Sequence, residues 1–244
     1  MLKLFSRTLP FVGTTLLVVA LAPAASNATT KPSAKTIEST MLSALQSKSS
    51  IELKFVTKES GQTMSGIQWA SHDSALQSTN YLGQTEHIMM IGSRLWVNDN
   101  ASGLQSMFNA TAAEANQWQN TWIAVPKSNS NYKFITSGLK GKSLFASFLP
   151  TGKVKVVGPK TVQGNSVYEL IGKSQKPNGL GGFPMVVVVS ASSPFIPLGT
   201  VISTTLGTRK FSSTLKVTGF NTKAPVAISV PTSAVAYVLT GMPK

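Results

Sequence analysis

The sequence predicts an α+β domain in which many short antiparallel strands are combined with three inserted helices. Two observations favour this class. Apolar and polar residues alternate with a period of two over much of residues 51–232, and clusters of Gly, Asn, Asp and Ser separate the alternating runs. Three other segments show helical spacing or a helix-capping pattern. Because the sequence has no fixed-period repeat and no long linker, residues 29–244 are expected to form one domain.

The first 28 residues are expected to be a secretory signal peptide. Lys3 and Arg7 precede an apolar run from Phe11 to Ala22, and small residues follow up to Ala28. This order of a basic start, an apolar segment and a small-residue cleavage site is typical of export signals. The apolar run is shorter than the roughly 20 residues that a membrane-spanning helix requires. We therefore expect the chain to be exported and the signal to be removed.

The first third of the exported chain is predicted to be a helix followed by a meander. Apolar residues recur at helical spacing in residues 34–48, which predicts one amphipathic helix. The period then changes to two, and a break at residues 59–61 divides residues 51–69 into a hairpin. Further short extended runs at residues 74–83 and 86–99 continue the meander.

Two more helices are expected in the middle of the chain. Thr111 and Glu114 have the spacing of a capping box, which predicts a short helix over residues 112–119. An apolar stripe from Leu139 to Leu149 predicts another helix, which Pro150 ends because its ring cannot continue the helical backbone.

The last third of the chain is predicted to return to strands. Residues 153–174 read as a hairpin with its tight turn at Gly164-Asn165. A run of four valines at residues 186–189 follows, and a continuous β-branched run favours a strand that is covered on both faces. Two further extended segments complete the predicted sheet.

The charge and the lack of cysteine narrow the possible partners. The chain has 22 basic and 8 acidic residues and no cysteine; removal of Lys3 and Arg7 with the signal leaves a formal charge of about +12. Without cysteine there is no disulfide, no zinc–thiolate site and no lipid attached to an N-terminal cysteine. Because nearly all the cations are lysines, the balance favours diffuse attraction to an anionic envelope surface, and nucleic acid is not expected as a partner.

Catalytic and metal-binding patterns are scarce in this sequence. It contains two histidines, His72 and His87, and neither a G-x-S-x-G nor an H-E-x-x-H motif. Each histidine adjoins an acid, but neighbours on a strand point to opposite faces, so these pairs do not predict an acid–base couple. No cofactor, metal site or enzymatic activity is expected. Methionine and tryptophan are instead frequent, and methionine suits apolar sites of irregular shape.

The order of elements resembles a known family. An exported chain with a helix, the hairpin "IELKFVTKESGQTMSGIQWAS" and the strand pair "IMMIGSRLWVND" is similar to the LolA/LolB-like lipoprotein-carrier half-barrels. A helix ending in "FLP", then "VKVVGPKTVQGNSVYELIG", "SSPFIPLG" and "KFSSTLKVTGF", resembles the mycobacterial LppX/LprG-type lipid-binding lipoproteins. Those lipoproteins keep a cysteine after the signal, whereas this chain has none.

The resemblance implies a strongly curved antiparallel sheet, or half-barrel, with helices covering its concave face. Between them it implies an apolar cavity that takes acyl chains. The residues expected to line this cavity are Ile51, Leu53, Phe55, Ile67, Trp69, Ile88, Met90, Leu95 and Val97, with Leu144, Phe145 and Phe148 as its lid.

The sequence therefore predicts a secreted or envelope-associated, non-enzymatic protein that holds a lipid or another amphiphile. Transport across or within the cell envelope is one role that such binding would serve. Two alternatives stay open. One is a sensor or interaction module of the envelope, whose cavity its own side chains fill. The other is a hydrolase, which would need His72 or His87 beside a serine and a carboxylate.

Overall fold

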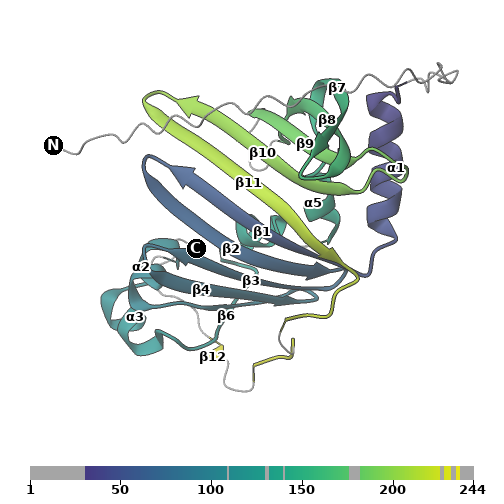
Figure 1. Cartoon of the computed structure of the whole chain (residues 1–244). Coiled ribbons are helices and arrows are strands. Elements are labelled where there is room, and N and C mark those ends of the chain that lie inside the picture. The colour runs from purple at the N-terminus through teal and green to yellow at the C-terminus, as the bar shows by residue number, and fades with distance from the viewer. Residues whose placement is uncertain are drawn as a thin grey trace, which may run out of the picture. The chain divides into compact units, whose positions relative to one another are not determined.

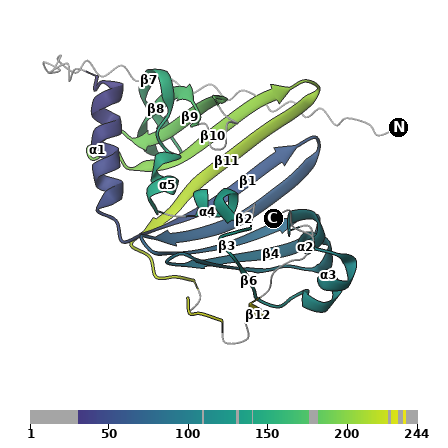
Figure 2. The same ribbon diagram turned by 180° about the vertical axis from the view of Figure 1, so that it is seen from behind.

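A computed structural model describes residues 31–108, 110–129, 132–139, 141–175, 182–225, 228–231 and 235–236. The chain divides into two units, residues 1–31 and residues 32–244, and the sheet and its helices belong to the second. The predicted signal peptide lies outside the described residues. Within the second unit, strands form one curved antiparallel sheet that does not close into a barrel, and helices pack on its concave side (Figures 1 and 2). The α+β half-barrel expected from the sequence is confirmed.

The helices are short except for the first, and two of them were not predicted. Ser33 caps the first helix by accepting a hydrogen bond from the Thr36 N–H. The predicted capping box is present in the third helix, where Thr111 and Glu114 bond each other's backbone N–H groups. The helices are α1 (Ala34–Gln46), α2 (Ala101–Phe108), α3 (Ala112–Trp118), α4 (Tyr132–Ser137) and α5 (Gly141–Ala146).

The strands follow the predicted hairpins closely in the first and last thirds of the chain. They are β1 (Ser50–Glu59), β2 (Gln62–Ser71), β3 (Ser74–Tyr81), β4 (Gln84–Ile91), β5 (Arg94–Asn98), β6 (Ile123–Val125), β7 (Thr151–Val162), β8 (Asn165–Lys173), β9 (Pro184–Ser190), β10 (Pro197–Leu206), β11 (Arg209–Phe220) and β12 (Val235–Ala236).

The sheet consists of two meanders joined by one long-range strand pair. Strands β1 to β6 lie in sequence order on one side, and β7 to β11 do so on the other. The two halves meet where β1 pairs with β11, with Ile51 opposite Phe220 and Glu59 opposite Phe211. All pairings are antiparallel except that of β12, which adds to β6 in parallel. Because β7 and β12 are the two ends of the strand order, the sheet stays open.

Pairing also defines the two faces of the sheet. Ile51, Leu53 and Phe55 of β1 lie on the inner, concave face, and the alternating residues lie on the outer face. The inner-face side chains pack with Leu104 and Phe108 of α2 and with the α5 region into one apolar core. The helices therefore cover only part of the inner face, and the hairpin ends of β1, β2, β10 and β11 extend beyond them (Figure 2).

The structure corrects three expectations about the elements. The helix predicted from Leu139 to Leu149 is regular only over α5, and the turns that follow it carry Phe148 into the core. The sequence pattern also gave no sign of α2, α4 and β6. Finally, the valine strand β9 is covered fully on one face only. Val187 and Val189 are buried, whereas Val186 and Val188 on the outer face are half-buried, since no described helix packs there.

Candidate ligand-binding site

Nine of the twelve residues predicted for the cavity lie together in the core of the concave side. Those from β1, β4 and β5 share the inner face, because Met90 pairs with Leu95 and Ile88 with Val97. The three lid residues pack against them from α5 and its following turns. All nine are buried, and Ile51, Leu53, Val97 and Phe148 have no exposed surface at all. These residues are Ile51, Leu53, Ile88, Met90, Leu95, Val97, Leu144, Phe145 and Phe148.

The other three predicted residues lie elsewhere. Phe55 is on the inner face but is half-buried, and its ring lies over Gly66 of β2, where a Cβ atom would come within 2.5 Å of it. Ile67 and Trp69 are on the outer face, since they pair with Lys54 and Glu52 of β1. These two side chains therefore cannot line the same space as Ile51. The register differs from the expected one by a single residue, which moves a side chain to the other face.

Trp69 belongs instead to a second apolar row. Trp69, Leu76, Met89 and Trp96 are directly opposite one another across β2, β3, β4 and β5, on the outer face. The segment that follows β11 runs over the beginning of this row, where the Trp69 Nε1–H donates to the Thr222 carbonyl oxygen at 3.1 Å. This contact explains why a tryptophan on the outer face is buried.

Beyond the packed core, the inner face contains a groove of about 510 Å³. Its floor is the inner face of β1 to β4 near the β1–β2 and β3–β4 turns, and its side wall is the start of α2. Gly103 lets α2 approach Asp99 closely, because a Cβ atom there would lie 1.8 Å from Asp99 Oδ2. The groove is lined by Thr57, Glu59, Gln62, Met64, Thr79, Tyr81, Leu82, Gln84, Glu86, Asp99, Ser102, Gly103 and Ser106.

Two carboxyl groups lie in the groove next to the core. Burial, with a smaller contribution from the charge of Asp99, raises the pKa of Glu86 to about 7. Burial also raises the pKa of Asp99, although the Asn100 N–H, which donates to Asp99 Oδ1 at 2.8 Å, and the charge of His87 lower it. Glu86 Oε1 is buried without a hydrogen-bond partner in the described part of the chain. A ligand group that donates hydrogen bonds or carries positive charge would compensate this carboxyl.

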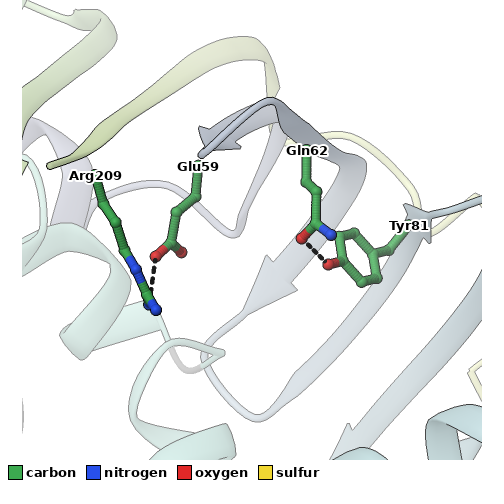
Figure 3. Close-up of polar contacts among 4 residues, drawn as sticks. All are labelled: Glu59, Gln62, Tyr81 and Arg209. Atoms are coloured by element: carbon green, nitrogen blue, oxygen red, sulfur yellow. Dashed lines mark hydrogen bonds and ion pairs between the residues drawn. The ribbon is translucent and has the colours of Figure 1, made fainter.

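Polar contacts hold the rim of the groove at the hairpin ends (Figure 3). The Tyr81 hydroxyl donates to Gln62 Oε1, which links β3 to β2. On the other side of the β1–β2 turn, the Arg209 guanidinium lies 4.0 Å from the Glu59 carboxylate. Both partners of this ion pair are exposed, so it contributes at most about 1 kcal/mol.

The groove residues were not predicted, although the alternation contained the signal. Glu86 lies two residues before Ile88 and Asp99 two residues after Val97, so the same period of two places both on the inner face. The two histidines do not meet there: His72 is exposed in the β2–β3 turn, and His87 points to the outer face beside Ser78 and Asn98. Among the residues that the structure describes, no three His, Cys, Asp or Glu side chains gather as a metal site.

Comparisons with known proteins identify the fold. No family model matches the chain, and no curated protein matches its sequence. Among solved structures, it is similar to the lipoprotein LppX of Mycobacterium tuberculosis, with a TM-score of 0.51 and 15% identity over 80% of this chain and 98% of that one. It is also similar to LprF of Mycobacterium bovis, with a TM-score of 0.51 and 12% identity over 82% and 99% of the two chains. The resemblance to these half-barrels is confirmed for the fold.

No helix within the described ranges has the length and the apolar character needed to cross a membrane.

Proposed function

We propose that this chain is an exported, non-enzymatic binding protein that holds a lipid or another amphiphile in the groove of its concave face. The observation that carries the proposal is the groove itself. Its volume of about 510 Å³ lies within the range of small-ligand sites, which is roughly 300–1,000 Å³. It opens on a half-barrel whose fold is similar to that of the lipoprotein LppX of Mycobacterium tuberculosis, and export with a cleaved signal peptide would bring this chain to the cell envelope.

The lining of the groove suits an amphiphile with a neutral or cationic polar end. Met64, Tyr81 and Leu82 offer apolar surface, and each buried CH₂ of a ligand contributes about 0.8 kcal/mol. Glu86 and Asp99 offer carboxyl oxygens at the inner end. A carboxyl with a pKa near 7 donates or accepts a hydrogen bond at neutral pH, which suits a hydroxyl or amine group. An anionic head group would be repelled there, so the lysines of the chain belong to contacts with an anionic envelope surface instead.

Native mass spectrometry of the exported chain tests this proposal. A co-purifying amphiphile, identified by solvent extraction, is expected at one molecule per chain. Met64→Lys, which places a charge in the apolar part of the groove, should remove at least about 90% of the bound molecule. Thr63→Lys is the matched control, because the neighbouring side chain is exposed on the opposite face of β2. Equal occupancy in both variants, or a wild-type chain that stays empty after incubation with envelope lipids, would contradict the proposal.

One observation favours a second function, an interaction or sensor module of the envelope. The inner-face core is filled by the chain's own Phe108, Phe145 and Phe148, each at most 5% exposed. A concave face closed in this way needs no ligand in order to be stable. An empty wild-type chain that captures an envelope protein through the groove rim would favour this alternative.

A further inference from the structure

We propose that the outer face of β10, β11, β1 and β2 docks on an anionic lipid bilayer. The inference rests on the proposed export of the chain to an envelope, but it requires no ligand in the groove, which lies on the opposite face. The docking face consists of Lys54, Val56 and Lys58 of β1, Lys210 and Lys216 of β11, and Val201 of β10. All six side chains are exposed.

Strand pairing collects the positive charges of this face into one patch. Lys54 lies directly opposite Lys216, and Lys58 lies four residues further along β1, on the other side of Val56. Like charges directly opposite each other on a sheet destabilise the pair. Across β2, β1, β11 and β10, no described acid occupies the rows of Lys54, Val56 and Lys58. The acid in the next row, Glu52, accepts a hydrogen bond from the Thr218 hydroxyl at 2.8 Å. An external anion would therefore compensate a repulsion that the fold leaves in place.

Exposed apolar side chains between the lysines distinguish a bilayer from a soluble anionic polymer. Val56, Thr214 and Val201 form one row across β1, β11 and β10. Val56 is 38% exposed and Val201 is 41% exposed, and Ile67 beside Lys54 is 41% exposed. A polymer of phosphates offers these side chains no apolar partner. A bilayer offers phosphates at the level of the lysines and acyl chains beneath them.

A hollow at the hairpin ends provides a place for one lipid phosphate. It has a volume of about 510 Å³ and lies between the β1–β2 and β10–β11 turns. Lys58 and Lys210 line it together with the hydroxyls of Ser203, Thr205 and Ser212. Glu59 lines it as well, but this carboxylate faces the Arg209 guanidinium at 4.0 Å. Lysine ammonium groups and serine or threonine hydroxyls are the donors that a phosphate accepts from.

Vesicle sedimentation of the exported chain tests the docking face. Wild type is expected to bind vesicles of phosphatidylglycerol and phosphatidylcholine, to bind pure phosphatidylcholine at least about tenfold more weakly, and to lose binding as salt increases. Lys54→Glu replaces a repulsion with Lys216 by an attraction, so its melting temperature should not fall. Its partition coefficient on anionic vesicles should nevertheless drop by about fivefold or more.

Two further variants make the outcome decisive. Lys127→Glu makes the same charge change at an exposed lysine after β6, and it should bind within about twofold of wild type. Equal losses in Lys54→Glu and Lys127→Glu would overturn the proposal, because net charge alone would then explain binding. Val56→Asn/Val201→Asn should weaken vesicle binding without changing binding to soluble polyphosphate. Vesicle binding that these two changes leave intact would overturn the bilayer in favour of an anionic polymer.

Discussion

At the scale of single residues, Glu86 has a strongly raised pKa in the folded protein. Its pKa rises from 4.5 to about 7, because β4 and α2 remove the carboxyl from water and Asp99 lies nearby. The folded state therefore holds a proton on Glu86 between pH 4.5 and 7 that the unfolded state has released. A raised carboxyl pKa makes the fold less stable as pH rises through this window.

Glu86→Gln is expected to stabilise the free protein at high pH. At pH 8 the gain should be on the order of 1–3 kcal/mol, since the variant removes an ionised buried carboxyl. The gain should shrink as pH falls and should be absent well below pH 4.5, where Glu86 is protonated in both states. Urea unfolding at pH 8 and pH 5 measures it. Asp73→Asn, in the exposed β2–β3 turn, is the control, and a pH-independent gain in Glu86→Gln would contradict the assignment.

The same residue scale shows what the sequence could and could not predict about the site. The inner face of β1, β4 and β5 followed from alternation, because apolar residues repeat with a period of two within each strand: Ile51 and Leu53, Ile88 and Met90, Leu95 and Val97. On β2 the alternation pointed the wrong way. Ile67 and Trp69 are more apolar than Gly66 and Gln68, yet the former pair lies on the outer face. Gln68 lies on the inner face because its amide donates to the Gly138 carbonyl oxygen, a partner 70 residues away that local pattern does not reveal.

At the scale of elements, the segment after β11, residues 221–225, covers part of the outer face at Trp69. The predicted hairpins were found, since each depends on alternation and a turn within about 20 residues. The β1–β11 pair and the cover over Trp69 depend on contacts between segments more than 150 residues apart. The Thr222 carbonyl oxygen accepts from both the Ser50 hydroxyl at 2.6 Å and the Trp69 Nε1–H at 3.1 Å. These two bonds attach the segment to β1 and β2.

Trp69→Phe is expected to loosen this segment while leaving the sheet intact. The variant keeps most of the aromatic surface but removes one of the two donors to Thr222. We expect a loss of about 1 kcal/mol in the free energy of unfolding and faster hydrogen exchange in peptides that cover residues 221–225. Exchange in β7 and β8 should be unchanged. Trp96→Phe, at the other end of the same row, is the control. Similar exchange in residues 221–225 of both variants would show that the hydrogen bond does not hold the segment.

At the scale of the whole molecule, the curved sheet separates two kinds of chemistry. Three of the eight acids, Glu59, Glu86 and Asp99, line the groove on the inner face. Four lysines occupy the docking face, on the outer side of β1 and β11. Side chains of one strand alternate between the two environments, so Thr57 lines the groove while Val56 and Lys58 face outward. A chain with a large positive charge can therefore keep an acidic, partly apolar groove next to an anionic surface.

This separation predicts that ligand binding and docking are independent. Met64→Lys should lose the co-purifying amphiphile yet sediment with anionic vesicles within about twofold of wild type, because one added charge lies on the far face. Lys54→Glu should show the reverse, with full occupancy in native mass spectrometry and weak sedimentation. Measuring both quantities on both variants gives four results. If docking fails in Met64→Lys as well, the bound amphiphile itself inserts into the bilayer, and the groove and the docking face act as one site.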